Sequence, residues 1–191
     1  TVTTPTDTQI VITRQFDAPR HLVFACYTQP ALIRRWLNGA EGWVMTVCEF
    51  EPKVGGKYRY EWKAPDGYVM GMGGVIREFE PVERVVSAEL FDEDWTGGET
   101  VSTLIFNEEN GRTTLVNTFV YSSKAARDGA LATPMAEGME YGYSKLDAVL
   151  VELAAQLETA MNDPRISALI CALVAAWLGY TIFVSTEAPG S

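Results

Sequence analysis

The side chains most often used in catalysis and metal binding are sparse in this sequence. The chain has one histidine, His21, and no cysteine, serine or aspartate partner is arranged near it for nucleophilic catalysis. The three cysteines, Cys26, Cys48 and Cys171, are far apart and form neither a CxxC pair nor a cluster with histidine. Phosphate-binding loops, dinucleotide-binding glycine motifs, HExxH and EF-hand loops do not occur. We therefore predict no catalytic histidine, no metal site, no cofactor, and reduced thiols in a cytoplasmic compartment.

Two polar residues fall where strand alternation expects apolar ones. If Leu115 and Phe119 point inward, Asn117 between them does so too, and Glu89 shares a face with Val85. A buried amide or carboxyl needs a hydrogen-bonding partner. The partner is either a bound ligand or, more conservatively, backbone or water near the rim of the sheet.

Aromatic residues supply the other candidate contacts. In residues 57–63 the aromatic side chains Tyr58, Tyr60 and Trp62 alternate with charged ones, so that one face of a strand is aromatic. We predict a cavity of a few hundred Å³ between that face and residues 139–143, a size typical of small-molecule sites. The predicted ligand contacts, most of which also serve the core, are Trp36, Tyr58, Tyr60, Trp62, Glu89, Phe106, Asn117, Phe119, Met139 and Tyr143.

A long helix over residues 133–161 is the element that must cover this face. Thr133 is a suitable N-cap and Pro134 suits the first helical position. Apolar residues then recur every three or four positions and form one stripe, which runs through Met135, Met139, Tyr143, Leu146, Leu150, Leu153 and Leu157. Gly138 and Gly142 each weaken the helix by about 1 kcal/mol relative to alanine. Their small size would also let a strand or a ligand approach closely.

The preceding residues predict a sheet. A strand at residues 9–16 is followed by two short helices, one from about Pro19 to Thr28 and one beginning at Pro30. Six more strands are predicted at residues 43–51, 57–63, 68–80, 84–91, 99–107 and 112–121. Short turns join them, which favours antiparallel pairing. The glycines of the GMGG stretch at 71–74 lie within a strand and indicate a bulge or a close approach. The predicted fold is α+β, with a curved seven-stranded antiparallel sheet around the long helix.

Composition limits the partners. The chain has 191 residues, 47% of them apolar, and a net charge of −10. That length and composition suit one domain with an appendage. The negative surface repels phosphate backbones, so we expect no nucleic-acid partner.

Several segments resemble the SRPBCC superfamily (START-like, birch-pollen-allergen-like), and more narrowly its branch named after the activator of the heat-shock-protein ATPase. The resemblance covers residues 9–160 and rests on Ala18, Pro19, Val23, Phe24, Thr28, Pro30 and Trp36, on Glu51–Tyr58, on Gly74–Val85, on Gly111–Leu115 and on Gly138–Leu153. Glu51 and Lys53 stand where the family usually has Asp and Arg. The resemblance implies a helix-grip fold with a hydrophobic pocket. It implies no single activity, because its members include lipid and polyketide binders, aromatases, cyclases and co-chaperones.

The C-terminal segment is a different kind of sequence. After a linker at 162–165, residues 166–184 carry no charge over a length near that of a bilayer-spanning helix, and residues 185–191 are polar. We predict a single-pass anchor that attaches a cytoplasmic domain to the inner membrane, in the orientation that Arg165 and Glu187 weakly favour. Its predicted lipid-facing residues are Ile166, Leu169, Leu173, Trp177, Tyr180 and Phe183. A further core helix, a dimerisation or subunit-packing segment, a non-native sequence and a soluble cytoplasmic protein are the alternatives.

The sequence therefore predicts a flexible N-terminus at 1–8, a helix-grip domain at 9–161 and an anchor. The leading interpretation is a non-catalytic, membrane-tethered domain that binds a small hydrophobic or aromatic ligand. A cyclase or aromatase acting on a polyketide-like substrate is the second, and a buried ionisable group opening on the pocket would favour it. An accessory or co-chaperone-like subunit of a membrane complex is the third, and a filled cavity would favour it.

Overall fold

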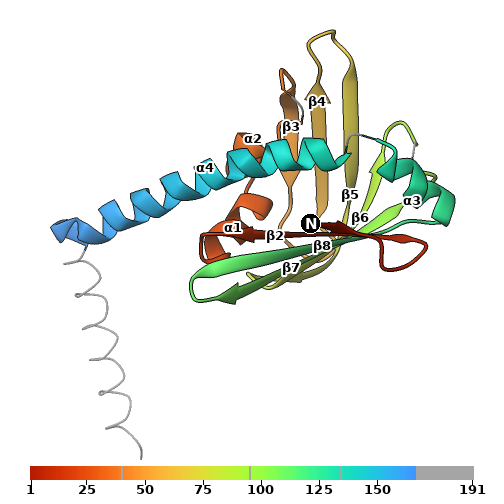
Figure 1. Ribbon diagram of the computed structural model, residues 1–191. Coiled ribbons are helices and arrows are strands. Elements are labelled where there is room, and N and C mark those ends of the chain that lie inside the picture. The colour runs from red at the N-terminus through yellow and green to blue at the C-terminus, as the bar shows by residue number, and fades with distance from the viewer. Residues whose placement is uncertain (40, 95, 134, 167–191) are drawn as a thin grey trace, which may run out of the picture. The chain divides into compact units, whose positions relative to one another are not determined.

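The computed structural model describes residues 1–39, 41–94, 96–133 and 135–166. The chain divides into two compact units, Thr1–Val151 and the residues from Glu152 onward. The first unit holds the whole sheet and the candidate site, and it is the unit described below (Figure 1).

The sheet is antiparallel and has eight strands. In chain order they are β1 (Val2–Thr3), β2 (Gln9–Phe16), β3 (Val44–Phe50), β4 (Lys57–Lys63), β5 (Val69–Glu80), β6 (Arg84–Phe91), β7 (Thr100–Glu109) and β8 (Arg112–Val120). Their order across the sheet is β1-β2-β8-β7-β6-β5-β4-β3. Strands β3 to β8 form a meander, and β2 pairs with β8 from far along the chain. The predicted α+β class and curved antiparallel sheet are confirmed.

The eighth strand is a correction to the predicted count of seven. Residues 1–8 were expected to be flexible, yet Val2 pairs with Ile12 and Thr3 with Val11. The N-terminal ammonium of Thr1 also donates a hydrogen bond to the Thr13 carbonyl oxygen at 2.7 Å. The polar sequence carries no strand signal, and the pairing depends instead on the free edge of β2, whose backbone groups accept any extended segment.

Among the described residues, the helices are α1 (Arg20–Thr28), α2 (Pro30–Trp36), α3 (Lys124–Leu131) and α4 (Met135–Asn162). Helix α3 was not predicted, because its sequence is short and lacks a wide apolar stripe. Its start is fixed locally, since the Ser123 side chain accepts a hydrogen bond from the backbone N–H of Ala126.

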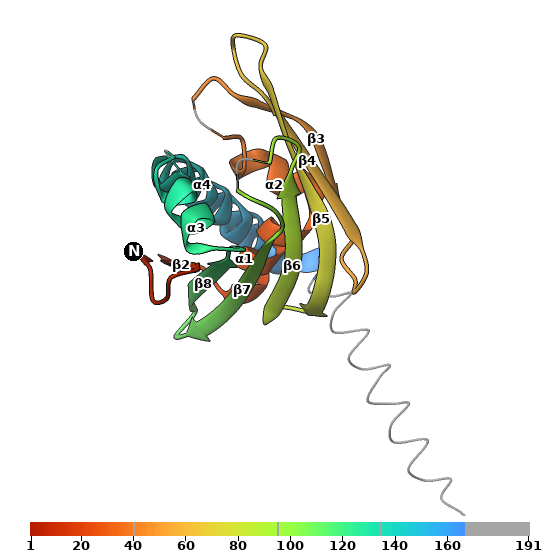
Figure 2. The ribbon, with the colours of Figure 1, turned by 90° about the vertical axis from the view of Figure 1, so that its right-hand side faces the viewer.

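The first part of α4 lies across the concave face of the sheet, which curves around it (Figure 2). Tyr143, Leu146 and Leu150 of the predicted stripe are all at most 3% exposed. Arg14 of β2 links the sheet to the helix, since it donates to the Glu140 carboxylate at 2.6 Å and to the Asp147 carboxylate at 2.7 Å. These contacts place the N-terminal half of α4 over the site.

The end of the predicted stripe is less buried than its middle. Leu153 is half-buried and Leu157 is 43% exposed, although both continue the same helical face. Periodicity identifies the apolar face of a helix, but it does not determine how much of that face finds a partner.

The glycines of β5 make room for neighbouring groups. Of the two explanations predicted for them, a bulge or a close approach, this agrees with the close approach. A Cβ on Gly74 would lie 1.8 Å from the Ala88 carbonyl oxygen and 2.8 Å from the Tyr58 hydroxyl. The irregularity in pairing lies further along the strand, between Ile76 and Glu78.

The predicted anchor falls on residues that the structure does not cover. Of its candidate lipid-facing residues, Leu169, Leu173, Trp177, Tyr180 and Phe183 lie outside the described residues. Within the described part of the chain, no helix has both the length and the hydropathy needed to cross a bilayer.

Candidate functional site

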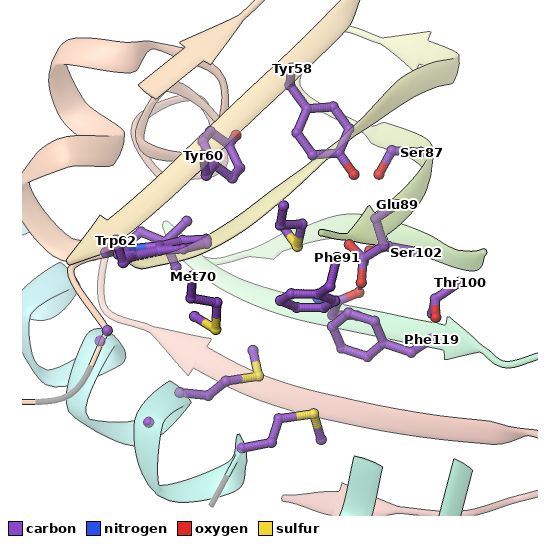
Figure 3. Close-up of a pocket in the computed structure, with 18 of the residues that line it drawn as sticks. Tyr58, Tyr60, Trp62, Met70, Ser87, Glu89, Phe91, Thr100, Ser102 and Phe119 are labelled. Carbon is purple, nitrogen blue, oxygen red and sulfur yellow. Dashed lines mark hydrogen bonds between the residues drawn. The ribbon is translucent and has the colours of Figure 1, made fainter. Parts of the chain in front are cut away.

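A cavity of about 680 Å³ lies between the concave face of the sheet and the first turns of α4 (Figure 3). Tyr58, Tyr60 and Trp62 line one side, and Met139 and Gly142 line the other. The predicted cavity between these segments is therefore confirmed, and its volume is within the range of small-molecule sites.

The aromatic wall on β4 is rigid. The rings of Tyr58 and Tyr60 are 5.4 Å apart and those of Tyr60 and Trp62 are 5.9 Å apart, centroid to centroid. The Trp62 indole N–H donates to the Leu37 carbonyl oxygen at 2.7 Å, and the Trp36 indole N–H donates to the Cys26 carbonyl oxygen at 2.8 Å. Because both indoles are held by hydrogen bonds, their apolar faces are preorganised against the cavity.

Most of the predicted contact residues line the cavity. They are Trp36, Tyr58, Tyr60, Trp62, Glu89, Asn117, Phe119 and Met139. Phe106 and Tyr143 are instead packed in the core, at 1% and 3% exposure. Phe106 lies 5.3 Å from the Phe24 ring and Tyr143 lies 5.9 Å from the Phe16 ring, again between centroids. Both residues are on the predicted face, but the rings of Tyr27 and Trp36, next to Phe106 and Tyr143 respectively, line the cavity in their place.

Three methionines in the lining were not among the ligand contacts predicted from the sequence. Met70 and Met72 come from β5 and Met135 from the start of α4, beside the predicted Met139. Met70 and Met72 could have been predicted from the alternation along β5, because they lie on the same face of the strand as the buried Ile76. Methionine is flexible and polarizable, so this wall can adapt to ligands of different shape.

A row of polar side chains crosses the floor of the cavity. Strand pairing sets Tyr58 opposite Gly74, Gly74 opposite Glu89, and Glu89 opposite Thr100. Tyr121 follows β8 and also lines the cavity. Because Gly74 has no side chain, nothing on β5 separates Glu89 from Tyr58, whose hydroxyl donates to the Ala88 carbonyl oxygen at 3.3 Å.

Glu89 is the carboxylate of the polar row. Figure 3 shows its side chain pointing inward beside Phe91, and it makes no hydrogen bond or ion pair with any described residue. Burial without a partner raises the pKa of this carboxyl from 4.5 to about 7. Burial also raises the pKa of Tyr121 to about 12, and the negative charge of Glu89 raises it in the same direction.

Asn117 has a partner within the protein. Its side-chain oxygen accepts a hydrogen bond from the Ser102 hydroxyl at 3.0 Å, and both residues are 6% exposed. The partner is thus a neighbouring strand's side chain, which belongs to neither of the two alternatives raised for this residue.

His21 and the described cysteines lie apart from this site. His21 is exposed on α1. Cys26 and Cys48 are buried free thiols, and burial raises the pKa of Cys26 to about 11, which disfavours the nucleophilic thiolate. Within the described ranges no cluster of three acidic, histidine or cysteine side chains could hold a metal ion.

Comparison with known proteins identifies relatives of this domain. Residues 17–151 match the family model described as "Activator of Hsp90 ATPase homolog 1-like protein". A crystal structure of a protein from Rhodobacter sphaeroides is 36% identical, covers 80% of this chain and 99% of its own, and has a TM-score of 0.75. No curated protein matches the chain.

Two further solved structures share the fold at lower identity. A solution structure of a protein from Arthrobacter aurescens is 26% identical over 80% of this chain and 91% of its own, with a TM-score of 0.69. A protein from Mycobacterium smegmatis is 24% identical over 78% of this chain and 95% of its own, also with a TM-score of 0.69. The similarity extends over nearly the whole length of each relative.

Proposed function

Because the chain belongs to the Activator of Hsp90 ATPase homolog 1-like family within the SRPBCC superfamily, we propose that its cavity reversibly binds a small hydrophobic or aromatic molecule. The observation that carries this proposal is the 680 Å³ cavity with aromatic and methionine walls. A domain selected only for a stable core would fill such a space, since each buried methylene contributes about 0.8 kcal/mol.

The chemistry of the walls sets the mode of binding. A ligand that buries roughly 200 Å² of apolar surface gains about 5 kcal/mol from desolvation. The indoles of Trp36 and Trp62 are already fixed, so little side-chain ordering opposes binding there. The methionines adjust to the outline of the ligand, whereas the polar row orients it.

The proposal can be tested with a variant that fills the cavity. Gly138 lines the cavity, and a Cβ built there meets no atom within 4 Å. Gly138→Leu should therefore obstruct the site without breaking the fold. Gly129→Leu on the exposed surface of α3 is the matched control, because that glycine also has open space around it.

The measurement is the fluorescence of N-phenyl-1-naphthylamine, which rises when the probe enters an apolar site. Wild-type protein and Gly129→Leu should bind it equally, and Gly138→Leu should bind at least tenfold more weakly. Equal binding by all three proteins would place the probe elsewhere and would reject this cavity as the ligand site.

A second candidate function is catalysis by Glu89. An ionisable side chain opening on the pocket is the feature that favours a cyclase or aromatase, and a pKa near 7 suits a general acid or base at neutral pH. In this reading Glu89 removes a proton from a carbon next to a carbonyl of a bound polyketide-like substrate.

The exchange of the α-protons of 2-tetralone with D₂O, followed by ¹H NMR, separates catalysis from binding. Glu89 acting as a base would accelerate the exchange, and Glu89→Gln would reduce the acceleration by about 100-fold. If both proteins leave the exchange rate at its value in buffer, the binding function stands alone.

Fewer observations support the accessory-subunit and membrane-anchor proposals. The unfilled cavity favours ligand binding over a pure interaction module. The proposed anchor at 166–184 is tested by fractionating cells that express the full chain. Recovery in the membrane pellet, with release by detergent but not by high salt, is the expected result, and recovery as a soluble monomer would reject it.

A further inference from the structure

Two side chains of the polar row, Glu89 and Thr100, make no hydrogen bond with any described residue. Glu89 and Thr100 face each other across the β6–β7 pairing, where directly opposed Cβ atoms lie about 4.5–5.5 Å apart. Thr100 is 2% exposed and its hydroxyl has no hydrogen-bonding partner in the structure. Glu89 is half-buried and lines the cavity, so its carboxylate is free to accept hydrogen bonds from a bound ligand.

The charged residues around the cavity indicate the charge of the ligand group that would bind there. Glu89 and Glu93 are the charged residues of the lining, and none of the described lining residues is lysine, arginine or histidine. Glu93 is exposed and already accepts a hydrogen bond from the Tyr68 hydroxyl at 3.1 Å. A ligand carboxylate or phosphate would meet only negative charge here, whereas a cation would meet attraction.

The aromatic side chains of the lining also favour a positively charged ligand group. Figure 3 shows Phe91 of β6 close to Glu89, and Phe119 of β8 and Tyr58 of β4, each two strands away across the sheet, also line the cavity. The faces of aromatic rings carry partial negative charge and attract cations, more strongly where water is excluded. Carboxylate and ring faces together are the surroundings in which proteins hold organic ammonium groups.

We propose that the ligand of this cavity is a hydrophobic or aromatic amine, whose ammonium group is held by the Glu89 carboxylate. An ammonium group offers several N–H donors, and the carboxylate accepts hydrogen bonds. The ammonium charge supplies the partner that the Glu89 carboxyl lacks. The rest of the molecule lies against the aromatic and methionine walls, so this inference rests on the proposed binding function.

Three probes that share a naphthalene ring and differ in charge distinguish binding in the cavity from the preference for an amine. They are 2-(2-naphthyl)ethylamine, 2-(2-naphthyl)ethanol and 2-naphthylacetate, which are cationic, neutral and anionic at pH 8. Their affinities for the full chain are measured by isothermal titration calorimetry. We expect the amine to bind at least tenfold more tightly than the alcohol and the acid to bind more weakly than either.

Variants then test whether Glu89 causes the preference for the amine. Glu89→Gln keeps the shape of the side chain and should bring the amine and the alcohol to within a factor of about two of each other, a small fraction of the 1.4 kcal/mol that a tenfold change represents. Thr100→Val removes a buried hydroxyl that a ligand in the cavity does not reach, so it should leave the amine preference in place. Glu109→Gln, which changes an exposed carboxylate at the end of β7, should bind all three probes as the wild type does.

The outcomes are distinct. Binding of the alcohol and the acid as tightly as the amine would support the cavity function and overturn the amine preference. An amine preference that survives in Glu89→Gln would also overturn it. If none of the probes binds the wild-type protein, both this inference and the proposed binding function fail.

Discussion

The buried carboxyl of Glu89 should make stability depend on pH in a direction opposite to that of an ion-paired acid. Its pKa is raised from 4.5 to about 7 in the folded state because burial disfavours the charged form. Below pH 4.5 the carboxyl is protonated in both the folded and the unfolded state and costs nothing. Between pH 4.5 and 7 the unfolded state loses the proton first, so the free energy of unfolding falls as the pH rises.

The size of this effect follows from the shift. One pKa unit corresponds to about 1.4 kcal/mol, so the shift amounts to about 3 kcal/mol of lost stability above pH 7. Glu89→Gln removes the charge and keeps the shape. The variant should therefore be more stable than the wild type at pH 8, by at most this amount because the buried amide also needs partners. Near pH 4.5 the two proteins should be about equally stable.

Urea unfolding monitored by tryptophan fluorescence measures these differences, provided that the transitions are two-state. Exposed acids such as Asp92, whose pKa is lowered by its hydrogen bond from Arg59, contribute the opposite slope. They do so equally in both proteins and cancel in the comparison. Glu109→Gln is the surface control and should show no such change. A difference between wild type and Glu89→Gln that is the same at pH 4.5 and pH 8 would refute the assignment of the pKa.

Three other substitutions have outcomes that unfolding experiments can check. Gly138→Ala should stabilise the protein by about 0.5–1 kcal/mol, since the helix gains propensity and the added methyl group meets open space; a loss of stability would show that the space is occupied. Thr100→Val should raise stability by about 1 kcal/mol, because it removes a buried hydroxyl that has no partner, and a loss would reveal a hydrogen bond. Gly74→Ala should cost about 3 kcal/mol through its clash with the Ala88 carbonyl oxygen, and a neutral result would contradict the close approach.

The strands and the long helix could be predicted from the sequence because periodicity is a local property. The strand at residues 9–16 and the strand at 57–63 have the predicted bounds, and alternation placed Glu89 and Asn117 on the inner face. The family resemblance added the way in which the sheet grips the helix. These features depend on each residue and its near neighbours, which the sequence displays directly.

The tertiary structure alone decided which inward residues reach the cavity. Phe106 and Glu89 both face inward, yet Phe106 is covered by Phe24 and Tyr27 whereas Glu89 remains open to the cavity. The opposition of Glu89 and Thr100 follows from strand register. Register and ring packing are set by contacts between residues far apart in the chain, and no local pattern records them. The sequence by itself therefore determined the elements and their inner faces, and long-range pairing determined the chemistry of the site.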